Sequence, residues 1–145
     1  MITLADITEE NLGDCEALER KSQKYVGGPL WVIAEAYVHR QNTTAYAICA
    51  DGVIVGLVNV IWNKRGEYSF TDLFIADPYQ NRGYGKQAVA AILDLFRARK
   101  EYPTVSIFVH DSNAVAIGLY RSCGFVVTGK AEWNEHFLVM RYRLS

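Results

Sequence analysis

The stretch Gln80-Asn81-Arg82-Gly83-Tyr84-Gly85-Lys86 decides how the rest of the chain is interpreted. It follows the apolar run 70–76, which is typical of a strand, and opens the pattern 83–99, which is typical of a helix. Two glycines at a strand-to-helix corner let the backbone approach a ligand closely. The N–H groups of the helix's first turn and the helix dipole then attract an anion. The corner is therefore expected to hold a phosphate group.

Two other phosphate-binding designs also use a glycine-rich corner. A P-loop is excluded, because it needs four residues between its glycines and a Ser or Thr after the Lys, where this chain has Gln87. The dinucleotide fingerprint fits the spacing from Gly83 to Ala88, and Asp111 follows the next candidate strand, 104–109. That fingerprint opens its helix directly from the strand, whereas residues 77–82 intervene here. We therefore disfavour a dinucleotide-binding module.

A third design resembles the chain more closely. The pattern Gln80-x-x-Gly83-x-Gly85 after a strand is similar to the segment with which the GNAT superfamily of N-acetyltransferases holds the pyrophosphate of acetyl-CoA. The segment Asn113-x-x-Ala116-x-x-Leu119-Tyr120-x-x-x-Gly124-Phe125 is similar to that superfamily's other signature. The resemblance covers about residues 43–128. It implies an acyl-CoA N-acyltransferase fold, with a mixed, mostly antiparallel central sheet flanked by about four helices.

Composition limits the other possibilities. A chain of 145 residues predicts one domain, here a single N-acetyltransferase domain over residues 1–145. A net charge of −1 offers no basic surface for nucleic acid. Three scattered cysteines indicate neither a disulfide framework nor a zinc site, so no metal is expected. The start of the chain has no leader pattern and no apolar run reaches about 20 residues, so we expect a cytoplasmic protein without a membrane partner.

Periodicity predicts the order of the elements. Residues 2–7 read as a strand, Thr8 as the cap of a first helix, and Pro29 as the start of a second helix. The apolar stripe of that second helix is expected to contain Leu30, Ile33, Ala34, Tyr37 and Val38. Alternation over 43–50, 53–62 and 67–76 predicts an antiparallel meander with a tight turn at Asp51-Gly52.

The second half of the chain predicts a change in strand direction. The segments 70–76, 83–99 and 104–109 form one βαβ unit, whose two strands must run parallel. Ser112 or Asn113 caps a further helix that ends at Gly124, and the strands 125–128 and 136–143 close the fold. The exposed edges of such a sheet make a homodimer plausible.

The resemblance implies a donor site. The backbone of Leu73, Phe74 and Ile75 would bind the pantetheine arm like an added strand, and Asn113 would contact the same arm. The residues expected around the pyrophosphate are Gln80, Asn81, Arg82, Gly83, Tyr84, Gly85 and Lys86. Acetyl-CoA is thus the expected acetyl donor.

Two residues are expected to carry the chemistry of transfer to an amine. Tyr120 is the expected general acid, because a phenol with a pKa of about 10 is protonated at neutral pH and can donate to a departing thiolate. Asp72 is the expected general base, because it lies two residues before Phe74 and shares its strand face. Glu67 and Glu135 are the alternative bases.

The acceptor amine is left open by the sequence. The tail 124–144 resembles that of small bacterial spermine/spermidine acetyltransferases, and an acidic cleft for a polyamine would contain Glu16, Glu19, Asp72, Glu132 and Glu135. Trp31, Trp133 and Tyr25 would instead suit an amino acid, a drug or a peptide N-terminus. A non-catalytic CoA-binding sensor on the same fold is the other alternative; it would not need Tyr120.

Overall fold

The computed structural model describes residues 1–19 and 28–144 of the 145-residue chain. The strands are β1 (Ile2–Asp6), β2 (Thr43–Ala50), β3 (Val53–Lys64), β4 (Glu67–Ile75), β5 (Thr104–His110), β6 (Val126–Lys130) and β7 (Phe137–Arg143). The helices are α1 (Leu12–Glu16), α2 (Pro29–Val38), α3 (Tyr84–Arg99) and α4 (Ala114–Ser122), with a 3₁₀ turn, η1 (Asp77–Tyr79).

The strands form one seven-stranded sheet in the order β1-β2-β3-β4-β5-β7-β6. All neighbours pair antiparallel except β4 and β5, which run parallel because α3 connects them. The mixed, mostly antiparallel sheet flanked by four helices is confirmed. The predicted β2–β3 turn at Asp51-Gly52 is confirmed as well. Arg65-Gly66 forms a second turn between β3 and β4, and all four of these residues have positive φ.

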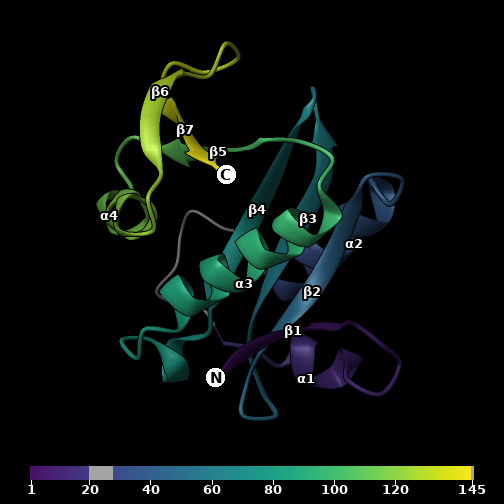
Figure 1. Ribbon diagram of the computed structural model, residues 1–145. Coiled ribbons are helices and arrows are strands. Elements are labelled where there is room, and N and C mark those ends of the chain that lie inside the picture. Colours follow the sequence, from purple (N-terminus) through teal and green to yellow (C-terminus); the bar gives the residue numbers. More distant parts are fainter. Residues whose placement is uncertain (20–27, 145) are drawn as a thin grey trace.

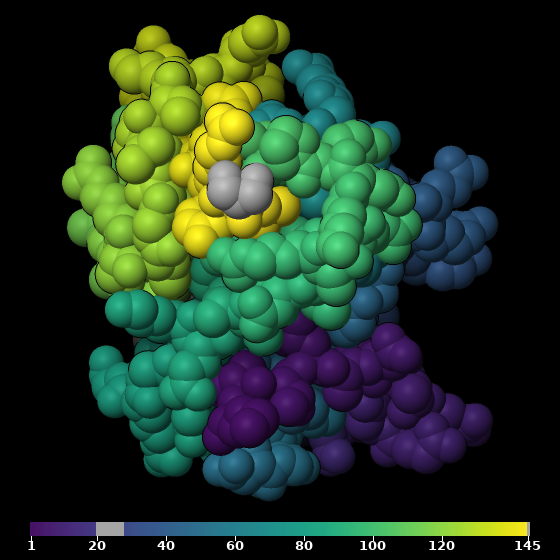
Figure 2. Space-filling model, in the orientation of Figure 1, coloured from purple at the N-terminus to yellow at the C-terminus, as the bar shows by residue number. Residues whose placement is uncertain are grey.

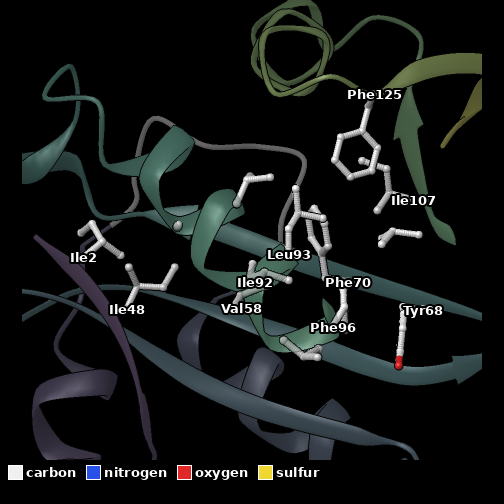
Figure 3. Packing of buried hydrophobic residues seen from close by; sticks show 14 of the residues in the cluster. Ile2, Ile48, Val58, Tyr68, Phe70, Ile92, Leu93, Phe96, Ile107 and Phe125 are labelled. Carbon is white, nitrogen blue, oxygen red and sulfur yellow. The ribbon is translucent and has the colours of Figure 1, made fainter. Parts of the chain in front are cut away.

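Helix α3 covers one face of the sheet and α1 and α2 cover the other (Figure 1). In the space-filling view α3 crosses the front as a green band, with the N-terminal segment below it and the C-terminal strand above it (Figure 2). Buried residues of α3, among them Ile92, Leu93 and Phe96, pack on Val58 and Phe70 of the sheet (Figure 3). Burial of this apolar surface is the main stabilising contribution to the fold.

Phe70 joins the two halves of the molecule. Its ring lies edge-on to Phe125, with 6.1 Å between ring centroids, and edge-on to Tyr120 of α4, at 5.8 Å. Figure 3 shows Phe125 and Ile107 beyond Phe70, on the side of β5. The core is therefore continuous across the point where β4 meets β5.

The predicted apolar stripe of α2 is wrong except at Ile33, which is partly buried against the core beneath α1 and α2. The buried residues of this helix are Val32 and Ala36, whereas Leu30, Tyr37 and Val38 are exposed, Val38 by 69%. Small side chains bring the helix backbone close to the sheet, so the larger apolar residues are left on the outer face.

The predicted cap of the first helix is also wrong. Helix α1 begins at Leu12 with Asn11 as its N-cap, and residues 9 and 10 form a turn before it. The Asn11 Oδ1 atom accepts a hydrogen bond from the Thr8 backbone N–H, at 2.7 Å. Thr8 therefore begins the turn and does not cap the helix.

Candidate functional site

Strands β4 and β5 diverge almost as soon as they meet. Their only pair in the described sheet is Tyr68 with Val105, whereas β5 pairs with β7 over its whole length. Leu73, Phe74 and Ile75 lie on β4 beyond this pair, and α3 and α4 are the helices that follow β4 and β5 in the chain. Ligands of such sheets bind beyond the carboxyl ends of parallel strands, where neighbouring connections leave in different directions. The opening between β4 and β5 is the candidate active site.

A β-bulge interrupts β4 within this opening. Asn59 pairs with Thr71 and Leu57 pairs with Phe74, so Asp72 and Leu73 together stand opposite Val58. Asp72 has a left-handed backbone, with φ of 59°. Such bulges re-aim side chains and are frequent beside active sites.

The bulge changes which face of the sheet each β4 side chain occupies. Before it, Tyr68 and Phe70 pack in the core beneath α3. After it, Phe74 packs with Cys15 of α1 and Val32 of α2, while Leu73 packs toward α3. The Asp72 carboxylate accepts a hydrogen bond from Asn59 Nδ2 at 3.4 Å, and the same nitrogen bonds to Val32. Asp72 thus shares the face of Phe74, as the sequence predicts.

The glycine-rich corner has the form expected of an anion site. Asn81 and Gly83 both have positive φ, and Gly83 is the N-cap of α3. The first N–H of this region to bond within the helix is that of Gln87, which donates to Gly83. In the part of the chain that the structure describes, the N–H groups of residues 83–86 have no acceptor. Four convergent donors at the positive end of a 16-residue helix suit a phosphate group.

Side chains of the corner divide into those that support it and those that remain available. Gln80 Nε2 donates to the Ile75 carbonyl at 2.9 Å and to Asp77 at 3.3 Å, so it braces the loop. Arg82 is exposed and donates to the Pro78 carbonyl at 3.3 Å. Lys86 is exposed as well. The 3₁₀ turn separates β4 from α3, which argues against the dinucleotide fingerprint.

Helix α4 lies beside this corner. A methyl group added to Gly85 would lie 3.4 Å from the Leu119 side chain, an ordinary contact, so the first turn of α3 lies next to α4. Asn113 is the N-cap of α4 and accepts from the Ala116 N–H at 3.2 Å. Asn113 is therefore the cap, one of the two residues that the sequence proposed.

Tyr120 of α4 points its ring into the aromatic group between the two halves of the sheet. The ring lies 5.8 Å from Phe70 and 5.9 Å from Phe125. Tyr120 is half-buried, and among the described residues its hydroxyl has no hydrogen-bond partner. Burial, with a smaller contribution from Cys123, raises the pKa of Tyr120 above its ordinary value. The phenol therefore stays protonated at neutral pH and keeps a proton to donate.

The alternative bases have other surroundings. Glu67 accepts from Arg141 Nε at 2.9 Å and from Thr104 at 2.9 Å. Burial raises the pKa of Glu67, but these hydrogen bonds lower it by more, so the pKa lies below its ordinary value. A carboxylate held this way is a weak proton acceptor. Glu135 is exposed, with 81% of its side chain accessible, and lies 4.0 Å from His136.

We expect Glu67→Gln to lower the free energy of unfolding by about 2 kcal/mol at pH 7, because a charged, twofold hydrogen bond to Arg141 is lost. The lowered pKa means that this stabilisation is present above the unfolded pKa of about 4.3 and is lost as the pH falls through the folded value. Urea unfolding at pH 7 and pH 3 measures it. Glu101→Gln, at an exposed pair with Arg99, is the control and should cost under about 1 kcal/mol. An equal deficit at both pH values for Glu67→Gln would contradict this account.

The structure does not assemble the predicted acidic cleft. Glu132 and Glu135 lie in the β6–β7 loop at the top of Figure 1, whereas Glu16 and Glu19 lie at or after the end of α1, at the opposite end of the view. Asp72 is in β4, between these ends. Five carboxylates spread along the molecule cannot surround one small amine.

Of the aromatic residues proposed for an acceptor pocket, the two in the described part of the chain have separate surroundings. Trp133 packs on Phe137 at 4.7 Å and on Phe108 at 5.5 Å, and Trp31 is 61% exposed on α2. Tyr25 lies outside the described residues. Within residues 1–19 and 28–144, no helix is long and apolar enough to cross a membrane, and no three His, Cys, Asp or Glu side chains are arranged to hold a metal ion.

The sequence patterns did not identify three residues that lie near the candidate site. Asn59 and Lys64 carry polar groups on the face of α2, and Gly56 pairs with Ile75, just beyond the bulge. A polar Asn59 and a glycine inside the apolar run 53–62 were the available signals, since each breaks the pattern of a buried strand. For Lys64 there was none, because it reads as the polar end of a strand.

Curated relatives are similar to part of this chain. Spermidine N(1)-acetyltransferase of Escherichia coli (strain K12) is 26% identical over 113 residues, which are 75% of this chain and 59% of that protein. Spermine/spermidine N(1)-acetyltransferase of Bacillus subtilis (strain 168) is 33% identical over 83 residues, 54% of this chain and 52% of that protein. The matched part thus spans between half and three-fifths of these relatives' length.

Solved structures share the fold over nearly the whole chain. Spermidine N-acetyltransferase from Vibrio cholerae, in complex with CoA and spermine, has a TM-score of 0.75 at 18% identity and covers 99% of this chain and 95% of that one. The ribosomal-protein-S18-alanine N-acetyltransferase from Escherichia coli has a TM-score of 0.72 at 17% identity, covering 100% and 95%. The acetyltransferase (GNAT) family model matches residues 5–125. With the split sheet, the bulge and the corner in place, this match establishes that the chain belongs to the acetyltransferase (GNAT) family.

Proposed function

We propose that the protein is an N-acetyltransferase that moves the acetyl group of acetyl-CoA directly to a primary amine in a ternary complex. The observation that carries this proposal is the opening between β4 and β5 beside four N–H donors at the start of α3. The donors suit a pyrophosphate, and the strand segment 73–75 suits an extended pantetheine arm. Arg82 and Lys86 add positive charge at the mouth of this site.

The proposed reaction depends first on position. Holding the thioester beside an amine contributes up to about 7–11 kcal/mol to lowering the barrier. Asp72 takes the proton that the protonated amine must lose, directly or through water, so that its nitrogen can attack the carbonyl carbon. Tyr120 gives its proton to the sulfur as the carbon–sulfur bond breaks. The attacking nitrogen loses its second proton through water to the Tyr120 phenolate, so the products are the amide and the free thiol.

A polyamine is the first proposed acceptor. It rests on the names of the curated relatives, which act on spermidine and spermine. Asp72, in β4 at the opening, is the carboxylate that would face a polyamine. The wider acidic cleft does not support a polyamine as acceptor, because its carboxylates lie far apart.

An amine that also carries a carboxylate is a second candidate acceptor, and Lys64 favours it. The Lys64 ammonium lies 4.3 Å from the centre of the Phe108 ring, and no carboxylate within the described residues forms an ion pair with it. Burial, and then the neighbouring Arg65, lower its pKa, while Glu35 of α2 opposes this. A half-buried cation near β5 suits an anionic group on the ligand.

The test of the proposed function is thiol release from acetyl-CoA, measured with a thiol-reactive dye, against a panel of amines. The panel contains spermidine, spermine, amino acids and peptides with a free N-terminus. Release with one of these amines supports the proposal and identifies its acceptor. No release from any of them, with acetyl-CoA still raising the melting temperature, would favour a CoA-binding sensor on this fold.

We expect Lys64→Gln to raise the KM for a carboxylate-bearing amine about tenfold, because one charged hydrogen bond to the acceptor is lost. The KM for spermidine should stay equal or fall, because a repelling charge is removed. Arg65→Gln, at the exposed neighbouring turn, is the matched control. Unchanged KM values for all carboxylate-bearing acceptors would exclude this role of Lys64.

A further inference from the structure

Asn59 is the buried polar residue nearest the bulge. It lies on β3 with no accessible surface, on the face that carries α2. Its Nδ2 atom donates to the Val32 carbonyl at 2.9 Å and to Asp72 Oδ2 at 3.4 Å. One amide nitrogen thus connects the α2 backbone to the carboxylate of the proposed base.

The orientation of this amide is fixed by its neighbours. Both atoms beside Nδ2 are oxygens that only accept hydrogen bonds, so a flipped amide would place Oδ1 against two acceptors. In the observed orientation Oδ1 is buried, and it is the one buried side-chain oxygen or nitrogen of the described residues without a partner. A buried acceptor left unpaired costs about 1–3 kcal/mol. The gain in stability from an amide at this position is therefore small.

The amide of Asn59 contributes little to stability, and its position along β3 indicates another role. Asn59 pairs with Thr71, the last residue before the bulge, and the next pair beyond the bulge is Leu57 with Phe74. Asp72 is the residue of β4 that adopts a left-handed backbone, so its side chain is not oriented by regular strand geometry. The Asn59 amide N–H group on the adjacent strand orients the Asp72 carboxylate, which the bulge alone does not do.

We infer that Asn59 is a positioning residue, whose amide N–H group holds the Asp72 carboxylate toward the acceptor amine. The inference rests on the proposed function, because it concerns the base of that reaction. Asn59 does not touch the reacting atoms. Its effect on catalysis passes through Asp72, whereas its bond to the Val32 carbonyl contributes to folding, and this difference makes the inference testable.

The experiment is a double-mutant cycle on kcat/KM, measured by thiol release with the amine that the panel identifies. The variants are Asn59→Leu, which has a similar volume without the polar atoms, Asp72→Asn and the double variant. We expect Asn59→Leu to lower kcat/KM for the amine by about 10- to 100-fold while the KM for acetyl-CoA is unchanged. In the Asp72→Asn background the same substitution should have almost no effect.

A second readout separates positioning from a general structural effect. The loss in Asn59→Leu should shrink at high pH, where the amine arrives without its extra proton and needs no base. Val58→Ala is the matched control, because Val58 is buried opposite the bulge on the other face of the sheet. It should lower the melting temperature and show the same fold-change with or without Asp72. Asn59→Ala repeats the cycle if the leucine variant does not fold.

Two results would overturn the inference. Equal fold-changes for Asn59→Leu in both backgrounds would show a role independent of Asp72. An Asp72→Asn variant with full kcat/KM would remove Asp72 as the base and with it the role of Asn59. The donor site and Tyr120 would remain in that second case, so it is distinguishable from a protein that releases no thiol with any amine.

Discussion

Replacing Tyr120 by Phe is expected to lower kcat by about 100-fold or more, since a positioned general acid contributes about 10²–10⁴. The thiolate of CoA would then leave without a proton from the protein. The ring contacts with Phe70 and Phe125 remain, and the lost hydroxyl has no partner among the described residues, so folding should be unaffected. Thiol release under saturating acetyl-CoA and a melting curve measure both effects.

Tyr142→Phe is the matched control for this prediction. Tyr142 also packs on Phe125, with 5.4 Å between ring centroids, and its hydroxyl accepts from Arg97 at 2.7 Å. Its loss should leave kcat within about twofold, which is small against the effect of a general acid. Unchanged turnover of Tyr120→Phe at every pH would show that another group, or water, protonates the thiolate.

Gly56→Ala is expected to cause the largest loss of stability, about 3 kcal/mol or more, or to prevent folding. A Cβ atom at this position would overlap the Phe74 carbonyl oxygen and would also lie 3.1 Å from its carbon. Both are backbone atoms of the central strand β4, so neither can move without breaking the pairing of β3 with β4. Chemical unfolding and the melting temperature measure the loss.

The control is a glycine in a strand without such a neighbour. Gly129 of β6 has no heavy atom within 4 Å of an added Cβ, so Gly129→Ala should leave stability within about 0.5 kcal/mol. A melting temperature of Gly56→Ala close to that of the parent protein would mean that β3 and β4 separate without cost where Gly56 pairs with Ile75. The segment 73–75 would then be a poor support for the pantetheine arm.

Local signals predicted most of the elements. Asp51-Gly52, Pro29 and Gly124 each impose a backbone geometry that does not depend on distant residues, and all three lie where the sequence places them. The buried face of α2 was mispredicted because Leu30 and Val38 outweigh Val32 and Ala36 in any apolar pattern. The distance between a helix and a sheet decides which of these faces is buried, and that distance is a tertiary property.

The candidate site also contains parts that local sequence signals predict and parts that they do not. The corner around Gly83 and the cap at Asn113 are built from neighbouring residues, so their motifs identify them. The contact of Asn59 with Asp72 depends on the pairing of β3 with β4 and on one extra residue in β4. The alternation of apolar residues in the sequence does not reveal that β4 contains one extra residue. The proposed acidic cleft failed because charges that look alike in sequence, such as Glu19 and Glu132, lie at different ends of the molecule.

The bulge makes Asp72 a residue that the sheet does not need. Deleting one residue from the middle of a buried strand normally exchanges the faces of every side chain that follows. Without Asp72, however, Leu73 would stand opposite Val58 in simple alternation, and Phe74 would keep the face that it has now. The chain therefore carries its proposed base as a supernumerary residue, which separates the requirements of catalysis from those of folding.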